Sequence, residues 1–389
     1  MGNLKIWLLS GLVTGLSVAA HYAGPTSMHG SNRDWERTVQ YHGELQSFKN
    51  RPLTTNVVIQ LVEKFHLTYR TAFFSLQFLL FFLTGRGIYF YLRQLGFSNR
   101  YSMTGMLLFM LSMPVFLAHL EPIHTWSDFW VYLLAPLSLG LAIQRKVLLS
   151  SMCMAVALLE YEIAWLLLPA LYLFTKQSHD GRHSIAAISN GIALGLYFVL
   201  VFLTVGFEPT RPTGHLTFNF ETALRTSDSL FSLFVSLGFL WVTGIFQVFK
   251  PAVIAVKYFQ TVRFNAVLTA LGFVGATFLF GGARESRHFV LPAFFLIPLT
   301  LWYFQKNRYA LSELVNRTVR TRLFKALWIL MIAAASVSTV MILFPNFEYR
   351  RWVDINRAYM SIHFAVVIIL VAFELFGAKA GKTLETKTR

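Results

Sequence analysis

The stretch TAFFSLQFLLFFLTGRGIYFYL, residues 71–92, decides the class of this chain, because it is predominantly apolar and carries one charged residue, Arg86. A helix needs about 20 such residues to cross the hydrocarbon core of a bilayer, so the sequence predicts an all-α bundle of about 10–12 transmembrane helices. The short segments 147–159 and 162–175 form either two spans or one broken pair. The other apolar segments cover approximately 5–23, 101–118, 128–143, 185–205, 229–249, 264–281, 288–304, 326–344 and 361–377.

The composition excludes most other classes of protein. Over 389 residues, 55% are hydrophobic, 13% are charged and the mean hydropathy is +0.54, which is too apolar for a soluble chain of this length. The net charge of +16 comes from cations that punctuate apolar runs, so we predict contact with membrane lipids and no nucleic-acid partner. A single cysteine, Cys153, excludes a disulfide framework or a cysteine metal cluster.

The distribution of basic residues predicts the orientation of the bundle. The positive-inside rule places the N-terminus and the C-terminus in the cytoplasm. Residues 1–378 then form one membrane domain and 379–389 a polar cytoplasmic tail, and compactness without targeting signals favours a bacterial inner membrane. Residues 1–23 are alternatively a signal peptide cleaved near Ala20, which also leaves the next loop outside. The inner basic residues are Arg93, Arg100, Arg145, Lys146, Lys176, Arg182, Lys250, Lys257, Arg263 and the run 306–325.

The acidic residues predict the functional face. On this topology most of the 18 acidic side chains lie outside, close to helix ends, where a plain spacer loop has no need of them. They include Asp34, Glu36, Glu44, Glu121, Asp128, Glu160, Glu162, Glu208, Asp228 and Glu285.

The first outer loop, residues 24–70, contains an amphipathic pattern. Val57, Leu61 and Phe65 recur at helical spacing, while polar side chains occupy the other side of residues 56–69. This pattern is typical of a helix in the membrane interface, or of a helix packed against the outer rim of the bundle.

The earliest candidate site is Ser31-Asn32-Arg33-Asp34-Trp35-Glu36-Arg37. A carboxylate just outside the bilayer and near arginines can accept a proton from an attacking hydroxyl at neutral pH. Ser31-x-x-Asp34 equally resembles a capping box at the start of a helix. The local sequence leaves both interpretations open.

A second candidate site is Gly281-Gly282-Ala283-Arg284-Glu285-Ser286-Arg287-His288. Arginines at the start of an apolar helix can bind a phosphate through charge-assisted bidentate bonds, and the helix N-terminus adds a favourable dipole. Arginines at helix ends also extend toward lipid headgroups, which explains the Gly pair and Glu285 less well.

The third candidate site is the outer turn 119–128. Its histidines and carboxylates, among them Glu121, His124 and Asp128, permit a divalent-metal site, although their spacing matches no specific motif. The need for a metal therefore stays open. Glu160 and Glu162 interrupt an apolar run, and charge at such a depth normally faces a polar cavity.

The order of these features resembles the GT-C superfamily, integral-membrane glycosyltransferases that take a sugar from a polyprenyl-phosphate carrier. The resemblance rests on Asp34 in the long first outer loop, Arg51-Pro52-Leu53 farther along it, and the acidic turn at Asp128. It continues with Arg145-Lys146 through Glu160 and Glu162, and with residues 284–288 before a proline-bearing helix, and it covers roughly residues 1–305.

The resemblance implies roles for these residues. Asp34 would be the general base for the acceptor hydroxyl, and Glu36 would take the partner role, because Trp35 stands where a second acid usually follows. Arg287, helped by Arg284 or His288, would bind the lipid phosphate, and the sugar would move by one inverting displacement. The absence of a large soluble C-terminal domain suggests a lipid or glycan acceptor. The substrate cavity would contain Arg51, Glu121, His124, Asp128, Glu160, Glu162 and Glu285.

Other functions predict different features. A transporter or lipid-glycan flippase predicts charge near the midplane and related half-sequences, and we find neither pattern. A polysaccharide polymerase or ligase would share the outer face but depend on loop arginines such as Arg211 and Arg225. A purely structural membrane protein does not explain the clustered carboxylates.

Overall fold

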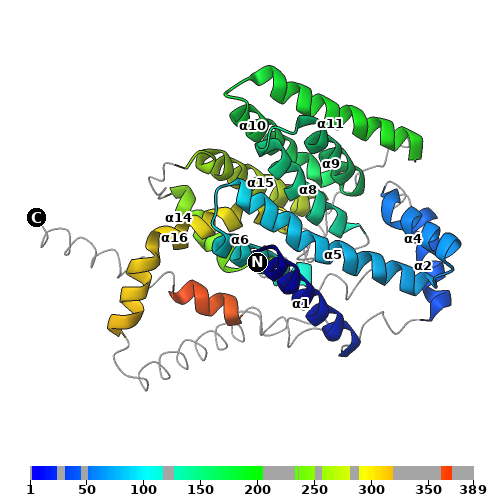
Figure 1. Ribbon diagram of the computed structural model, residues 1–389, viewed down its shortest axis with the longest axis horizontal. Helices are drawn as coiled ribbons and strands as arrows, with labels where there is room; N and C mark the ends of the chain where they lie inside the picture. The colour runs from blue at the N-terminus through cyan, green and yellow to red at the C-terminus, as the bar shows by residue number, and fades with distance from the viewer. Residues whose placement is uncertain are drawn as a thin grey trace, which may run out of the picture.

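A computed structural model describes residues 2–23, 31–44, 51–116, 127–204, 233–234, 236–249, 256–280, 289–318 and 361–369. Within these ranges every regular element is a helix, which confirms the predicted all-α class (Figure 1). The elements are α1 (Gly2–Ala23), α2 (Asn32–Glu44), α4 (Pro52–Phe65), α5 (Tyr69–Gln94), α6 (Asn99–Met110), α7 (Met113–Phe116), α8 (Asp128–Ile143), α9 (Val147–Glu160), the 3-10 helix η3 (Glu162–Leu167), α10 (Leu168–Ser178), α11 (His183–Thr204), α14 (Phe239–Phe249), α15 (Phe259–Phe280) and α16 (Ala293–Thr318), and residues 361–369 are also helical.

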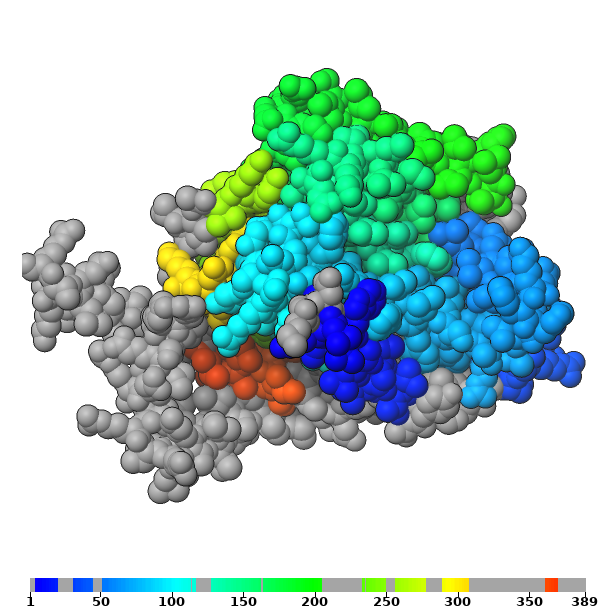
Figure 2. All heavy atoms as spheres, viewed as in Figure 1, coloured from blue at the N-terminus to red at the C-terminus, as the bar shows by residue number. Residues whose placement is uncertain are grey.

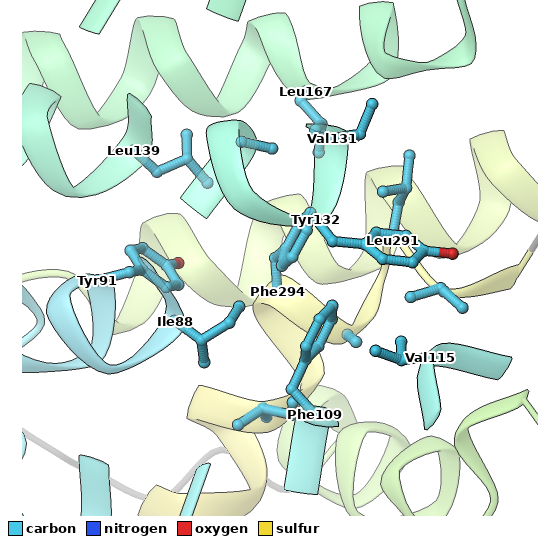
Figure 3. Packing of buried hydrophobic residues seen from close by; sticks show 14 of the residues in the cluster. Ile88, Tyr91, Phe109, Val115, Val131, Tyr132, Leu139, Leu167, Leu291 and Phe294 are labelled. Carbon is cyan, nitrogen blue, oxygen red and sulfur yellow. The ribbon is translucent and has the colours of Figure 1, made fainter. Parts of the chain in front are cut away.

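Helix α5 is central to the bundle and packs against α1, α2, α4, α6 and α8. The adjacent core joins distant parts of the chain through Phe109 of α6, Tyr132 of α8 and Phe294 of α16 (Figure 3). The Phe109 ring lies edge-on to Tyr132 with centroids 5.7 Å apart and stacks on Phe294 at 5.5 Å. Such aromatic pairs stabilise a core beyond the area they bury. The N-terminal helices and α16 therefore form one packed unit.

Several helix boundaries differ from those predicted. The segment 101–118 is broken after Met110, because Pro114 has no N–H to continue the helical hydrogen bonds. The 147–175 segment is a broken pair, since Tyr161 is extended (φ −154°, ψ 102°) between α9 and η3. In the described part of 229–249, α14 begins at Phe239, and Gly238 directly before it is a turn residue with a φ of 48° that separates α14 from the helical residues 236–237. The segment 326–344 lies outside the described residues.

Two of the described helices, α5 and α11, are long and apolar enough to cross a membrane. The same test is met by the buried core helix of a soluble protein or by a signal sequence. Of the most apolar stretch of each helix, 61% is buried inside the bundle for α5 but only 17% for α11. Figure 2 shows α11 along the upper edge of the molecule, in green. Shorter apolar helices are Leu4–Ala19, Asp128–Ile143, Val147–Glu160 and Phe239–Phe249.

One end of the helix bundle is rich in basic residues. Arg145 forms a 3.3 Å ion pair with Asp180, which joins the turn after α8 to the turn after α10. Gln177 accepts a 2.7 Å hydrogen bond from the Thr261 hydroxyl, which brings the start of α15 to the same place. These contacts gather the predicted cytoplasmic residues Arg145, Lys146, Lys176, Arg182, Lys257 and Arg263, and we call this region the basic end.

Helices α2 and α4 lie at the other end of the bundle, where α5 begins and α11 ends (Figure 1). We call this region, residues 31–44, 51–69, 127–130 and 160–161, the α2/α4 end. Helix α4 packs against α2, α5 and α9, with Val58 fully buried. The described contacts therefore agree with the predicted amphipathic helix packed on the rim, although it begins four residues earlier than the predicted start at 56.

Candidate functional site

The centre of the candidate site is the Glu160 side chain, the last residue of α9, which is fully buried. Its Oε1 atom accepts a 2.8 Å hydrogen bond from the backbone N–H of Leu53, 107 residues earlier in the chain. Leu53 lies in the first turn of α4, whose N-cap residue, Arg51, provides no side-chain cap. The first N–H groups of a helix have no partner within the helix, and a carboxylate there also interacts favourably with the helix dipole. Glu160 thus caps α4 from a distant helix.

Helix α8 holds the same place together. The Ser127 hydroxyl donates a 3.0 Å hydrogen bond to the Glu160 carbonyl, and the Trp130 indole donates a 3.1 Å bond to the Thr54 hydroxyl. Asp128 begins α8 between these two residues and is buried, in a first turn where a carboxylate is favoured. Consecutive residues of the first turn of α4 are therefore fixed by α9 and by α8.

Arg51 brings positive charge to this cluster. Its guanidinium lies over the ring of Tyr161, 5.2 Å from the centroid, in a cation–π contact. Arg51 is two residues before Leu53, and Tyr161 directly follows Glu160. The chain segments around Arg51 and Glu160 therefore touch through two adjacent contacts. The structure brings together Arg51, Asp128 and Glu160, three of the predicted cavity residues.

Asp34 forms the predicted capping box at the start of α2. Its Oδ2 accepts a 2.6 Å bond from the Ser31 hydroxyl and a 2.9 Å bond from the Ser31 N–H, and the Asp34 N–H donates back to the Ser31 hydroxyl at 3.3 Å. The pKa of this exposed carboxyl is lowered below its ordinary value of 3.8. The largest cause is the hydrogen bond from the Ser31 hydroxyl, and smaller contributions come from the Ser31 N–H and from the positive charges of Arg37 and Arg33. Capping is thus confirmed, while the role of Asp34 as a base stays a prediction.

Trp35 attaches α2 to the bundle. Its ring is buried, stacks on Phe73 with centroids 5.0 Å apart, and meets Phe74 edge-on at the same distance. Both partners lie in the first turns of α5. Glu36, the predicted partner acid, is half-buried on α2. The position of both predicted acids therefore depends on how Trp35 packs.

The remaining predicted site residues are not placed. Glu121, His124, Arg284, Glu285, Arg287 and His288 lie outside the described residues, and so does the side chain of Glu162. The predicted approach of Arg287 to Asp34 stays a prediction for that reason. Among the side chains that the structure does describe, no three His, Cys, Asp or Glu groups are arranged to hold a metal ion.

Sequence reasoning missed several residues of the site. Ser127 and Tyr161 stand next to a predicted residue, and Trp130 and Thr54 lie two and three positions from one, but none of the four carries a motif of its own. Trp35 had a detectable signal, because Trp35, Val39 and His42 recur at helical spacing and all three are buried. That spacing predicts a second amphipathic helix before α4.

Comparison with known proteins adds no further evidence. No protein-family model, no curated protein and no solved structure matches this chain.

Proposed function

We propose that this chain is an integral-membrane glycosyltransferase that moves a sugar from a polyprenyl-phosphate donor to a lipid or glycan acceptor on the non-cytoplasmic face. The observation that carries the proposal is the contact between Glu160 and the first turn of α4, beside Arg51 and Asp128. These residues come from three of the separate motifs whose order resembles the GT-C superfamily. The contact gives those motifs a common location.

The surface of α11 supports a membrane location. Its 22 residues span about 33 Å, close to the roughly 30 Å hydrocarbon thickness of a bilayer. Phe202 and Leu203 are 67% and 73% exposed, and Ile188 and Val199 also face outward. An apolar surface of this kind needs lipid or protein to cover it.

The separation of charge supports the orientation. The basic end holds six of the lysines and arginines that the positive-inside rule assigns to the cytoplasm. Asp34, Glu36, Asp128 and Glu160 belong to the α2/α4 end. We therefore assign the α2/α4 end to the bacterial periplasmic side, with both termini in the cytoplasm.

The proposed reaction is a single inverting displacement. The acceptor hydroxyl oxygen attacks the anomeric carbon, Asp34 takes the hydroxyl proton, and the bond from that carbon to the phosphate oxygen breaks. The electron pair leaves with the polyprenyl phosphate, which Arg287 binds with Arg284 or His288. Asp34 is ionised at neutral pH, because its pKa lies below the ordinary value of 3.8. Glu36 assists as the neighbouring acid.

The test is sugar transfer by the purified protein in lipid nanodiscs, using a panel of radiolabelled undecaprenyl-phosphate hexoses and pentoses and bacterial lipid extract as acceptor. We expect Asp34→Asn to abolish transfer while expression and thermal unfolding stay unchanged. Glu63→Gln, an exposed acid on neighbouring α4, is the matched control and should keep full activity. Normal turnover by Asp34→Asn would remove Asp34 from the mechanism. Movement of intact lipid-linked sugar across vesicles without transfer would favour the flippase instead.

A further inference from the structure

We infer that Glu160 is a positioning residue for Arg51: by capping α4 from the end of α9, it fixes the Arg51 guanidinium where the anionic group of the substrate binds. The binding part of this inference rests on the proposed function. It gives Glu160 a role besides the substrate contact that the sequence suggests, because its Oε1 atom accepts a hydrogen bond from the protein backbone.

The N-terminus of α4 needs a hydrogen-bond acceptor from outside the helix. Its N-cap residue is an arginine, which has no acceptor atom, and Pro52 in the first turn has no N–H. Leu53 is therefore the first residue of the helix whose N–H needs a partner, and the Glu160 carboxylate accepts it at 2.8 Å.

Glu160 itself is held in a fixed position. It ends α9, the Tyr161 N–H bonds to the Ala157 carbonyl at 3.1 Å, and the Ser127 hydroxyl holds the Glu160 carbonyl at 3.0 Å. Its side chain is fully enclosed. The carboxylate is therefore a fixed point to which α4 is attached.

Arg51 lies directly before α4 and moves with the first turn of this helix. The chain enters α4 through Arg51, whose backbone (φ −119°, ψ 69°) is not helical, and its guanidinium rests on the Tyr161 ring. Fixing Leu53 on Glu160 brings Arg51 onto Tyr161, the next residue after Glu160. A planar, permanently charged guanidinium held in this way suits a phosphate. The position of Arg51 thus depends on the cap that Glu160 provides to α4.

The first test is hydrogen exchange of the full-length protein in nanodiscs, followed over residues 51–58. We expect Glu160→Ala to speed exchange of the first turn of α4 about tenfold and Glu160→Gln, which keeps an acceptor oxygen, by less. Ser127→Ala should give a smaller change in the same direction, and it tests the same attachment if Glu160→Ala does not fold. Glu63→Gln is the control on the exposed side of α4. Unchanged exchange in both Glu160 variants would overturn the inference.

The second test is a double-mutant cycle on the affinity for undecaprenyl phosphate, measured with Arg51→Ala, Glu160→Gln and the double variant. We expect Glu160→Gln to weaken binding about fivefold alone and to have no further effect once Arg51 is removed, because coupled residues are not additive. Additive losses would show that Glu160 contacts the substrate itself and would overturn the positioning role.

The two tests separate this inference from the proposed function. Faster exchange in α4, with no binding of undecaprenyl phosphate by the wild-type protein, would support the capping of α4 by Glu160 and reject the proposed donor. A general loss of thermal stability with unchanged exchange in residues 51–58 would identify Glu160 as a structural residue of the core and overturn the inference.

Discussion

Replacing Trp35 by alanine should detach α2 from the bundle without unfolding the rest of the protein. Trp35 is 3% exposed, and its ring contacts Phe73 and Phe74 of α5. The other buried side chains of α2 are Val39 and His42, so one tryptophan supplies much of the apolar surface that this helix buries. Phe109 and Phe294 belong to the same hydrophobic cluster as Trp35, Phe73 and Phe74, but the ring contacts of Phe109 are to Tyr132 of α8 and Phe294 of α16.

The size of the effect follows from the buried area. A tryptophan buries about 150–250 Å², which at about 25 cal/mol per Å² corresponds to roughly 4–6 kcal/mol as an upper estimate. Measured losses for buried Trp→Ala changes are about 3–5 kcal/mol, so we expect about 4 kcal/mol here. Val39 and His42 bury less apolar surface than a tryptophan does, so the loss of Trp35 removes much of the free energy that orders the 13 residues of α2. The helix should therefore unfold locally.

The assay is hydrogen exchange over residues 32–44, compared with thermal unfolding of the same sample. We expect Trp35→Ala to lose protection throughout α2 and to shift Tm only slightly, with Trp35→Phe intermediate. Gln40→Ala, at an exposed position of the same helix, should match the wild type. Because Asp34 and Glu36 lie on α2, sugar transfer should fall with the protection. Full protection of residues 32–44 in Trp35→Ala would refute the reasoning.

Two further predictions concern charge and packing. Ser31→Ala removes the largest cause of the lowered Asp34 pKa, so this pKa should rise toward 3.8 and the acid limb of the pH–activity profile should move to higher pH. Because the pKa of Asp34 is lowered in the folded state, this carboxyl stabilises the protein at neutral pH, and that stabilisation is lost as the pH falls through the folded-state pKa. The Ser31→Ala variant should therefore lose less stability on acidification than the wild type. Gly105→Ala should lower stability by about 1–3 kcal/mol, because its Cβ would lie 2.4 Å from Leu92 Cδ1 and 2.9 Å from Leu301 Cδ1. Gly195→Ala is the matched change in α11, where nothing lies within 4 Å of the new Cβ, and it should raise the unfolding temperature through better helix propensity.

The sequence was informative where a feature depends on local chemistry. The predicted segment 128–143 coincides with α8, and the capping box read from Ser31-x-x-Asp34 is present. Both features are set by residues within a few positions of one another, where hydropathy and side-chain hydrogen bonding decide the outcome.

The sequence could not predict the partner of Glu160. A buried carboxylate predicts a polar environment, but which group provides it depends on how α9 packs against the rest of the bundle. The partner is a backbone N–H 107 residues away, and a backbone group has no signature in the sequence. The same limit applies to Trp130 and Thr54, which lie 76 residues apart. Neither residue belongs to a recognisable motif.

The attachment of α2 and α4 has a consequence for the chemistry of the α2/α4 end. Asp34 lies on a helix attached mainly through one tryptophan, and Arg51 precedes a helix whose first turn depends on one carboxylate and one indole. Elements with few buried contacts open at a lower free energy than the core. The distance between Asp34 and Arg51 therefore depends on how α2 and α4 pack against the rest of the bundle. Substitutions at Trp35 or Glu160 should consequently change transfer more than unfolding, and substitutions such as Gly105→Ala should change unfolding more than transfer.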